Sequence, residues 1–265
     1  MMDHVGTRTS LSVESCQIAG MPRGGPEASC LDRLLQTDRL DYLNRDSDGD
    51  TELQARKLSV MRALDWTDAL LGNPERFAMI ALDEVAEVAD PQILELGAGH
   101  GGLSYKLLEW HPTARLTVTD LEPTAVAAIA AGELGADPRA TVRQMDATAL
   151  DATDGEFDLA VFALALHRLP PAAAAQVFAE GTRVARKLLI IDLPRPPTPL
   201  HILRLAMMLP LAPVVPFLHD GVISSLRAYS PAALRALASH ADPEIEVELR
   251  GGPVSPQVVV ASRPH

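Results

Sequence analysis

The chain has 265 residues, of which 47% are hydrophobic and 22% charged, which is ordinary for a globular protein. Its net charge of −12 disfavours nucleic acid as a partner, because that binding depends largely on Lys and Arg at phosphates. The 2 cysteines lack metal-ligand spacing, so we expect no metal site. With no signal peptide apparent, a reducing cytoplasm is the expected location.

The first ninety residues divide into two parts. Residues 1–28 are rich in Gly, Pro, Ser and Thr without periodicity, and we expect them to be disordered. Residues 29–90 carry helical patterns, interrupted at 44–50 by an acidic run whose spacing fails the EF-hand pattern and favours a polar turn. We expect residues 29–90 to form a helical cap or lid, with Trp66 near the substrate.

From residue 91 the rhythm changes. Apolar runs at 92–96, 115–119, 141–145, 158–163 and 187–192 alternate with helical patterns at 101–110, 123–131 and 171–185. This alternation is typical of βαβ units on a parallel sheet. Ser230 and Pro231 begin a further helix, and runs at 244–249 and 257–261, joined by a short Gly-Gly-Pro link, predict an antiparallel hairpin.

Residues 194–229 form an insertion before that last helix. Its apolar stretch, 198–218, is long enough to suggest a membrane span. It also contains Arg204, His201 and three prolines, which suit a soluble fold better. We therefore expect no stable insertion into a membrane.

The motif ILELGAGHGG at residues 93–102 fits two cofactor patterns. Gly97, Gly99 and Gly102 make G-x-G-x-x-G, which is typical of dinucleotide sites. Glu95, Gly97, Gly99 and Gly101 make E-x-G-x-G-x-G, a pattern that cradles S-adenosylmethionine. Both need a strand, a tight turn and a helix N-terminus, so the glycines alone do not separate them.

The acidic residues near this loop do separate the two patterns. Glu95 would repel a pyrophosphate, whereas it attracts the ammonium and sulfonium of S-adenosylmethionine. Asp120 ends the second strand and suits a ribose diol of either cofactor. Asp146, followed by Ala147 at the end of the third strand, is placed to accept from an adenine amino group, although Asp is also common in strand-end turns.

At these residues the chain resembles the class I S-adenosylmethionine-dependent methyltransferases. The resemblance covers residues 91–262 and rests on ILELGAGHGG, the acids in TVTDLEP and RQMDATAL, the strand FDLAVFALALHRL and the terminal hairpin. It implies a Rossmann-like, doubly wound sheet of seven strands within a methyltransferase domain at 91–265. It also implies that the cofactor contacts Glu95, Gly97, Ala98, Gly99, Gly101, Asp120, Leu121, Asp146, Ala147 and Ala163.

Residues after the fourth strand bear on the acceptor. ALALH at 163–167 replaces the N-P-P-Y of many amino-group methylating enzymes and looks like the small-molecule branch that includes quinone-biosynthesis enzymes. His167 is a candidate base or substrate contact, or a residue that fixes its loop. His219 is a second candidate base, although Asp220 and Gly221 after it favour a turn.

In this family the segment after the fifth strand commonly shapes the acceptor pocket. The insertion is therefore expected to line an apolar cavity, with plain packing on the sheet or a homodimer contact as alternatives. Arg227 and Tyr229 could line the same pocket, and the alternative for each is an ordinary surface role. The candidates for this pocket are Trp66, Met207, Met208, Phe217, Arg227 and Tyr229.

These features predict methyl transfer to oxygen or carbon of a hydrophobic small molecule. Phenolic, quinone-like or polyketide-like compounds of secondary metabolism fit that description. The alternatives are an NAD-dependent oxidoreductase and a cofactor-binding but inactive scaffold protein. Binding of S-adenosylhomocysteine or of NAD separates the two enzyme hypotheses.

Overall fold

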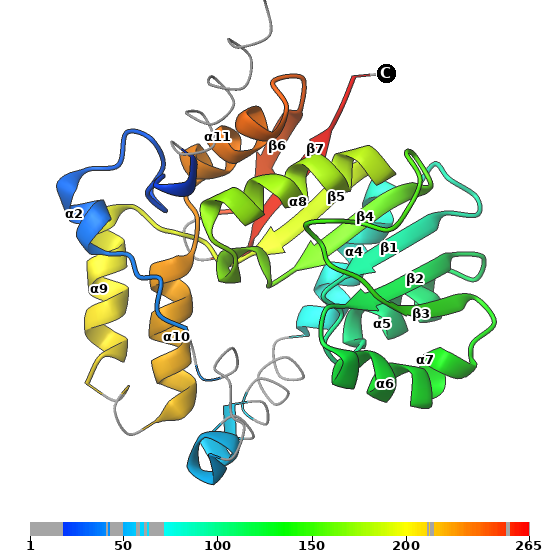
Figure 1. Ribbon diagram of the computed structural model, residues 1–265, viewed down its shortest axis with the longest axis horizontal. Coiled ribbons are helices and arrows are strands. Elements are labelled where there is room, and N and C mark those ends of the chain that lie inside the picture. The colour runs from blue at the N-terminus through cyan, green and yellow to red at the C-terminus, as the bar shows by residue number, and fades with distance from the viewer. Residues whose placement is uncertain are drawn as a thin grey trace, which may run out of the picture.

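The computed structural model describes residues 18–40, 42, 50–56, 59–60, 63, 72–210, 212, 215–252 and 255–264. Within these residues a seven-stranded sheet has helices on both faces (Figure 1). The predicted Rossmann-like α/β fold is confirmed.

The strands run in the order β3-β2-β1-β4-β5-β7-β6. The first five in sequence pair in parallel, while β7 is antiparallel to both β5 and β6, which confirms the predicted hairpin. Because the chain moves outward from β1 to β3 and then returns to β4, the order reverses between β1 and β4, where open α/β sheets bind ligands. The strands are β1 (Gln92–Leu96), β2 (Arg115–Asp120), β3 (Ala140–Gln144), β4 (Phe157–Ala163), β5 (Ala185–Asp192), β6 (Glu246–Arg250) and β7 (Gln257–Ser262).

Short and medium helices connect and cover these strands. Several begin with a proline in the first turn, where the missing N–H has no intrahelical partner to lose. The helices are α2 (Cys30–Leu34), α4 (Asn73–Glu84), α5 (Gly102–Trp110), α6 (Pro123–Ala131), α7 (Glu133–Ala136), the 3-10 helix η1 (Leu166–Arg168), α8 (Pro171–Val184), α9 (Thr198–Met208), α10 (Pro216–Arg227) and α11 (Pro231–Ala241).

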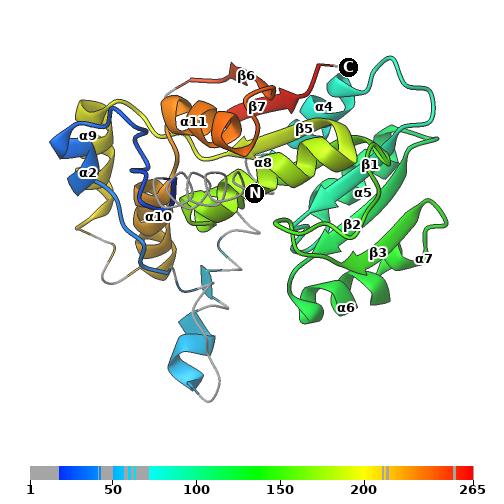
Figure 2. The same ribbon diagram turned by 45° about the horizontal axis from the view of Figure 1, so that its top comes forward.

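Alternation along the strands separates the core into two layers. Ile93 packs with α4 and α5 on one face of the sheet, and Leu94 packs with α8 and α11 on the other. Figure 2 shows these helix pairs on opposite sides of the strands. The helices α2, α9 and α10 lie together beyond the carboxyl ends of the parallel strands (Figure 1).

The N-terminal expectation needs a correction. Residues 18–28 are not disordered, because Ile18 and Met21 are buried in the core that includes α11, and Arg23 is 3% exposed. Two apolar side chains and one arginine thus anchor a segment whose overall composition is that of a flexible chain. Residues 1–17 and Trp66 lie outside the described residues.

The insertion folds as two packed helices, α9 and α10. Asp220 and Gly221 lie inside α10, so the predicted turn at these residues is wrong. A Cβ atom at Gly221 would lie 2.7 Å from Cε of Met208 in α9, so this glycine permits the two helices to pack closely. Among the described residues, no helix is both long and apolar enough to cross a membrane.

Candidate active site

The loop between β1 and α5 distinguishes the two glycine patterns. Gly97, Gly99 and Gly101 have φ angles of 64°, 56° and 75°, a region that non-glycine residues rarely occupy. Gly102 lies in α5 with an ordinary φ, and a Cβ there would make a normal 3.6 Å contact with Pro74. The backbone therefore needs the glycines of E-x-G-x-G-x-G, and it does not need Gly102. A Cβ at Gly99 would meet no atom within 4 Å, so the loop is open at that point.

Glu95 is a buried carboxylate beside this loop. It is 4% exposed and accepts a hydrogen bond from the Ser104 hydroxyl of α5. Burial raises its pKa to about 7, and the negative charge of Asp120 adds to that increase. No cationic side chain among the described residues forms an ion pair with Glu95. The site is therefore suited to a ligand that brings its own positive charge.

Asp120 joins the glycine loop to β2. One carboxylate oxygen accepts from the backbone N–H of Gly99 at 2.9 Å, and the other accepts from that of Glu122 at 2.9 Å. The N–H of Ala98 donates to the carbonyl of Thr119 at 2.9 Å. Leu121, next in the chain, is 58% exposed. The carboxyl end of β2 therefore holds the loop in its shape.

Asp146 follows β3 in an exposed turn. Its Oδ1 accepts from the backbone N–H of Thr148 at 2.8 Å and from the Thr148 hydroxyl at 2.7 Å. This is the strand-end turn that the sequence also allowed, and Ala147 beside it packs against the core. The turn fixes the direction of Asp146 and leaves its other carboxylate oxygen without a hydrogen bond to a described residue.

The end of β4 lies next to the glycine loop. A Cβ at Gly97 would be 3.3 Å from the ring of Phe162, one residue before Ala163. Leu164 follows with a φ of 52°, which is unusual for a non-glycine residue, and its N–H donates to the carbonyl of Ile191 at 2.7 Å. Such strain costs roughly 1–3 kcal/mol and is frequent at functional sites.

His167 is held by a carboxylate from the neighbouring strand. It lies in η1, and its Nδ1 is 2.7 Å from Oδ1 of Asp192 at the end of β5. Its backbone N–H donates to the other oxygen of Asp192, also at 2.7 Å. Both residues are buried. Sequence reasoning missed Asp192, although an acid at the carboxyl end of a strand beside β4 is the same signal that identified Asp120.

Two pocket candidates, Arg227 and Tyr229, instead support the His167 loop. Arg227 is 3% exposed, and its guanidinium donates to the carbonyls of His167, at 3.2 Å, and of Arg168. The Tyr229 hydroxyl donates to the carbonyl of Leu169 at 2.8 Å. Neither residue has the surface role that sequence reasoning considered.

The comparisons with known proteins agree with this geometry. A family model described as a methyltransferase domain matches residues 93–187, about a third of the chain, from β1 into β5. No curated protein matches the sequence.

The chain therefore contains a methyltransferase domain. Its cofactor is S-adenosylmethionine.

Three solved structures show the same fold at low sequence identity. A protein from Nostoc punctiforme, provisionally assigned as an O-methyltransferase, has a TM-score of 0.54 and 16% identity, over 78% of this chain and 60% of that one. The pyocyanin biosynthetic protein PhzM has a TM-score of 0.51 and 17% identity, over 69% of this chain and 54% of that one. The [4+2]-cyclase SpnF has a TM-score of 0.50 and 16% identity, over 66% of this chain and 58% of that one. The chain thus spans less than two thirds of the length of each.

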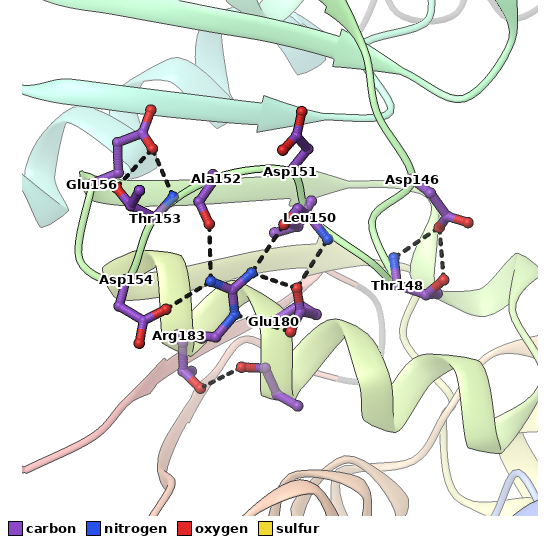
Figure 3. A network of polar contacts seen from close by, with 12 residues as sticks. Asp146, Thr148, Leu150, Asp151, Ala152, Thr153, Asp154, Glu156, Glu180 and Arg183 are labelled. Carbon is purple, nitrogen blue, oxygen red and sulfur yellow. Dashed lines mark hydrogen bonds and ion pairs between the residues drawn. The ribbon is translucent and has the colours of Figure 1, made fainter.

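A network of polar contacts fixes the loop that follows Asp146 in the methyltransferase domain (Figure 3). Arg183 of α8 donates to the carbonyls of Leu150 and Ala152 at 2.9 Å each, and it pairs with Asp154 and Glu180 at 2.7 Å each. Sequence reasoning missed this cluster, because its members are separated by about 30 residues. It holds the β3–β4 loop, and hence the start of that loop at Asp146, against α8.

The second candidate base, His219, lies apart from His167. Its ring stacks on Tyr42 with centroids 4.4 Å apart, and its Nδ1 is 3.0 Å from Oδ1 of Asp220. Arg227, which contacts the His167 carbonyl, is two turns further along α10, about 12 Å away along the helix axis. The structure therefore places only His167 beside the carboxyl ends of β4 and β5.

The remaining pocket candidates that the structure describes differ in their exposure. Met207 is 73% exposed on α9, whereas Met208 and Phe217 are half-buried on α9 and α10. A cavity of about 600 Å³ lies between the 194–199 link and the β6–β7 turn, and none of the predicted pocket residues lines it.

Proposed function

We propose that this protein transfers a methyl group from S-adenosylmethionine to an oxygen or carbon atom of a hydrophobic small molecule. Phenolic, quinone-like and polyketide-like compounds are the acceptors to test. The observation that carries this proposal is the His167–Asp192 pair at the carboxyl end of the sheet, close to the strand end that approaches the glycine loop.

The residues beside the loop fit the proposed cofactor. Glu95 offers a buried negative charge without a protein cation, the loop is open at Gly99, and Asp120 is fixed beside it. When bound, the cofactor supplies a methyl group on a positively charged sulfur, which needs no further activation. The residues that we propose hold it are Glu95, Gly97, Ala98, Gly99, Gly101, Asp120, Leu121, Asp146, Ala147 and Ala163.

His167 is suited to remove a proton from the acceptor. With the Asp192 carboxylate at Nδ1, the neutral ring carries its proton on that nitrogen and leaves Nε2 as the proton acceptor. Among the described residues, Nε2 has no hydrogen-bond partner. Removal of a phenol or enol proton raises the nucleophilicity of the acceptor, and such general-base catalysis typically contributes 10²–10⁴-fold.

The apolar character of the acceptor is inferred from α9 and α10, where Met208 and Phe217 are half-buried beyond the carboxyl ends of the strands. An exposed, unpaired Cys30 fits a reducing, cytoplasmic location. The charge of −12 makes nucleic acid an unsuitable acceptor.

We also propose that the exposed face of α9 pairs with a second copy of the chain. This face and the adjacent α2 expose Leu31, Leu34, Leu200, Ile202, Leu203, Met207 and Leu209. Residues 193–219 contain no Asp or Glu, although the chain has 35, so on this negatively charged chain no carboxylate of α9 would face a carboxylate of the second copy. Light scattering should show a dimer that Leu203→Lys with Met207→Lys converts to a monomer, whereas Met79→Lys, at another exposed methionine, should not.

Methyl-labelled cofactor tests the reaction. The purified protein is incubated with labelled S-adenosylmethionine and a panel of phenols, hydroquinones and naphthols, and products are identified by mass spectrometry. We expect label in an oxygen- or carbon-methylated product, and loss of that product in His167→Asn. Calorimetry with S-adenosylhomocysteine and with NAD decides between the cofactors, since binding of NAD alone would contradict the proposal. Cofactor binding without any methylated product, together with co-purification of another enzyme, would instead favour a scaffold.

A further inference from the structure

Arg23, in the N-terminal segment, is buried against the loop that carries His167. Its side chain is 3% exposed. One guanidinium nitrogen, Nη1, donates to the carbonyl of His167 at 3.0 Å and to the carbonyl of Arg227 at 2.9 Å. The acidic partner Asp38 is 3.5 Å from Nη2 but 92% exposed. Backbone carbonyls therefore provide much of the environment of this buried charge.

The segment around Arg23 is fixed independently of that side chain. Its backbone N–H donates to Oε1 of Gln36 at 2.8 Å, and its carbonyl accepts from the N–H of Ser230 at 2.9 Å. The hydroxyl of Ser230 donates to the carbonyl of Gly24 at 2.7 Å. Because the backbone is held on both sides, Arg23 is presented to η1 in a set direction.

The carbonyls that Arg23 and its neighbours bind need external donors. η1 has only three residues, so the carbonyls at its end lack intrahelical partners. Arg23 and Arg227 both donate to the His167 carbonyl, and the Tyr229 hydroxyl donates to that of Leu169. The guanidinium of Arg23 also lies over the Tyr229 ring, 4.5 Å from its centroid. The turn that carries His167 is therefore completed by side chains distant in sequence.

We propose that Arg23 is a positioning residue for His167. Asp192 holds the ring and the backbone N–H of His167, and Arg23 holds the carbonyl of the same residue. Without Arg23, the carbonyl keeps only the longer contact from Arg227, and η1 is free to shift relative to β5. The ring would then lose its fixed contact with Asp192. This inference rests on the proposed role of His167.

The test compares Arg23→Gln with Arg33→Gln. Arg33 belongs to the same segment, is exposed, and donates to the carbonyl of Ala28, so its substitution makes the same change in charge away from η1. Proteins labelled with ¹⁵N-histidine and saturated with S-adenosylhomocysteine are studied by NMR, with His167→Asn identifying the His167 signals. The readouts are the tautomer of the ring and the hydrogen exchange of its Nδ1 proton.

We expect the wild type and Arg33→Gln to show one tautomer, protonated at Nδ1. Arg23→Gln should show both tautomers and proton exchange at least about tenfold faster, since the local restraint is weakened. Its dissociation constant for S-adenosylhomocysteine should change less than about twofold, because Arg23 contacts His167, Arg227 and Tyr229 and none of the proposed cofactor residues. A tautomer and exchange rate equal to those of Arg33→Gln would overturn the proposal.

A second variant covers failure of Arg23→Gln to fold. Arg23→Lys keeps the positive charge, but its nitrogen lies one bond nearer the backbone than Nη1, so it does not keep both carbonyl contacts at their present distances. It should give an intermediate exchange rate, and a rate equal to that of the wild type would again overturn the proposal. If His167→Asn methylates the acceptor as fast as the wild type, His167 is not the base. The NMR comparison still tests whether Arg23 positions the His167 ring, because its readouts do not depend on activity.

Discussion

The carboxylate of Asp192 holds His167 at two atoms, with 2.7 Å from one oxygen to Nδ1 of the ring and 2.7 Å from the other to the backbone nitrogen. This pair connects the ends of β4 and β5, which neighbour each other in the sheet. An acid in this position determines the tautomer as well as the direction of the ring. The pair therefore fixes the geometry of the base that we propose, independently of the acceptor.

Asp192→Asn should show whether the carboxylate acts by setting the tautomer of the His167 ring or only by packing against the loop. Asparagine keeps an oxygen for the backbone N–H of His167, but its amide can donate to Nδ1 and so favour the wrong tautomer. We expect kcat/KM to fall about 10²-fold or more, with unchanged binding of S-adenosylhomocysteine. Asp151→Asn, at a carboxylate that is 95% exposed, should be neutral in the same assay. Full activity in Asp192→Asn would contradict a role for the pair.

Cofactor affinity should depend on the ionisation of Glu95. Its pKa is about 7, and only the ionised form attracts a cationic ligand. The dissociation constant of S-adenosylmethionine, measured by calorimetry, should therefore decrease as pH rises from 6 to 8 and then level off. In Glu95→Gln binding should be weaker and nearly independent of pH over this range. An equal pH dependence in both proteins would show that another group is responsible.

The same residue should also affect stability without ligand. The pKa of Glu95 is raised on folding from 4.5 to about 7, so the folded state binds the proton more tightly and loses stability as pH rises through this interval. Glu95→Gln should thus stabilise the protein at pH 8 by at most about 3 kcal/mol, given about 1.4 kcal/mol per pKa unit. At pH 4.5 the difference should be small. Urea unfolding at both pH values measures it.

The three positions Gly99, Gly101 and Gly102 should respond differently to alanine. Gly101→Ala combines a φ of 75° with a Cβ only 2.5 Å from Cδ1 of Leu134, and we expect a loss of about 1–3 kcal/mol in unfolding free energy. Gly102→Ala should be neutral or stabilising by up to about 1 kcal/mol, as in an ordinary helix. Gly99→Ala should cost about 1 kcal/mol through its φ of 56° without a steric clash, and it should weaken cofactor binding, because the added Cβ enters the open space. Loss of cofactor binding in Gly102→Ala alone would favour the dinucleotide pattern.

Acid should loosen the pairing of α9 and α10 through His201. This residue is fully buried, and its Nε2 lies 3.2 Å from the hydroxyl of Ser225 in α10. Burial, with nearby arginines, lowers its pKa from 6.5 to about 4. Between pH 6.5 and 4, His201 therefore binds a proton in the unfolded chain but not in the folded protein. The free energy of unfolding thus falls as pH decreases over this range.

His201→Gln should reduce this acid sensitivity, whereas His240→Gln, at an exposed histidine of α11, should leave it unchanged. Thermal unfolding between pH 4 and pH 7 tests both. Identical pH dependence in His201→Gln and the wild type would contradict the assignment.

Local pattern was enough to predict the sheet and the cofactor loop. Apolar runs bounded by turn residues predicted the seven strands to within two residues at either end. The signal is strongest for β1, β4, β5 and β7, because nearly all their residues are buried. The spacing of Glu95 and the glycines likewise depends on one strand, one turn and one helix. The turn at Asp220 and Gly221 was predicted wrongly because Gly221 permits the close approach of Met208, and this contact between two helices leaves no local pattern.

By itself, the sequence determined the fold class, the glycine loop with its acidic neighbours and the methyltransferase family that they indicate. Only the tertiary structure decided that Asp192 contacts His167, that Arg227 supports the same loop while His219 lies elsewhere, and that Arg23 contacts the His167 carbonyl. The first set depends on residues close in the chain, whose geometry follows from backbone rules. The second set depends on side chains from 25 to 144 residues away, which meet only when strands and helices pack.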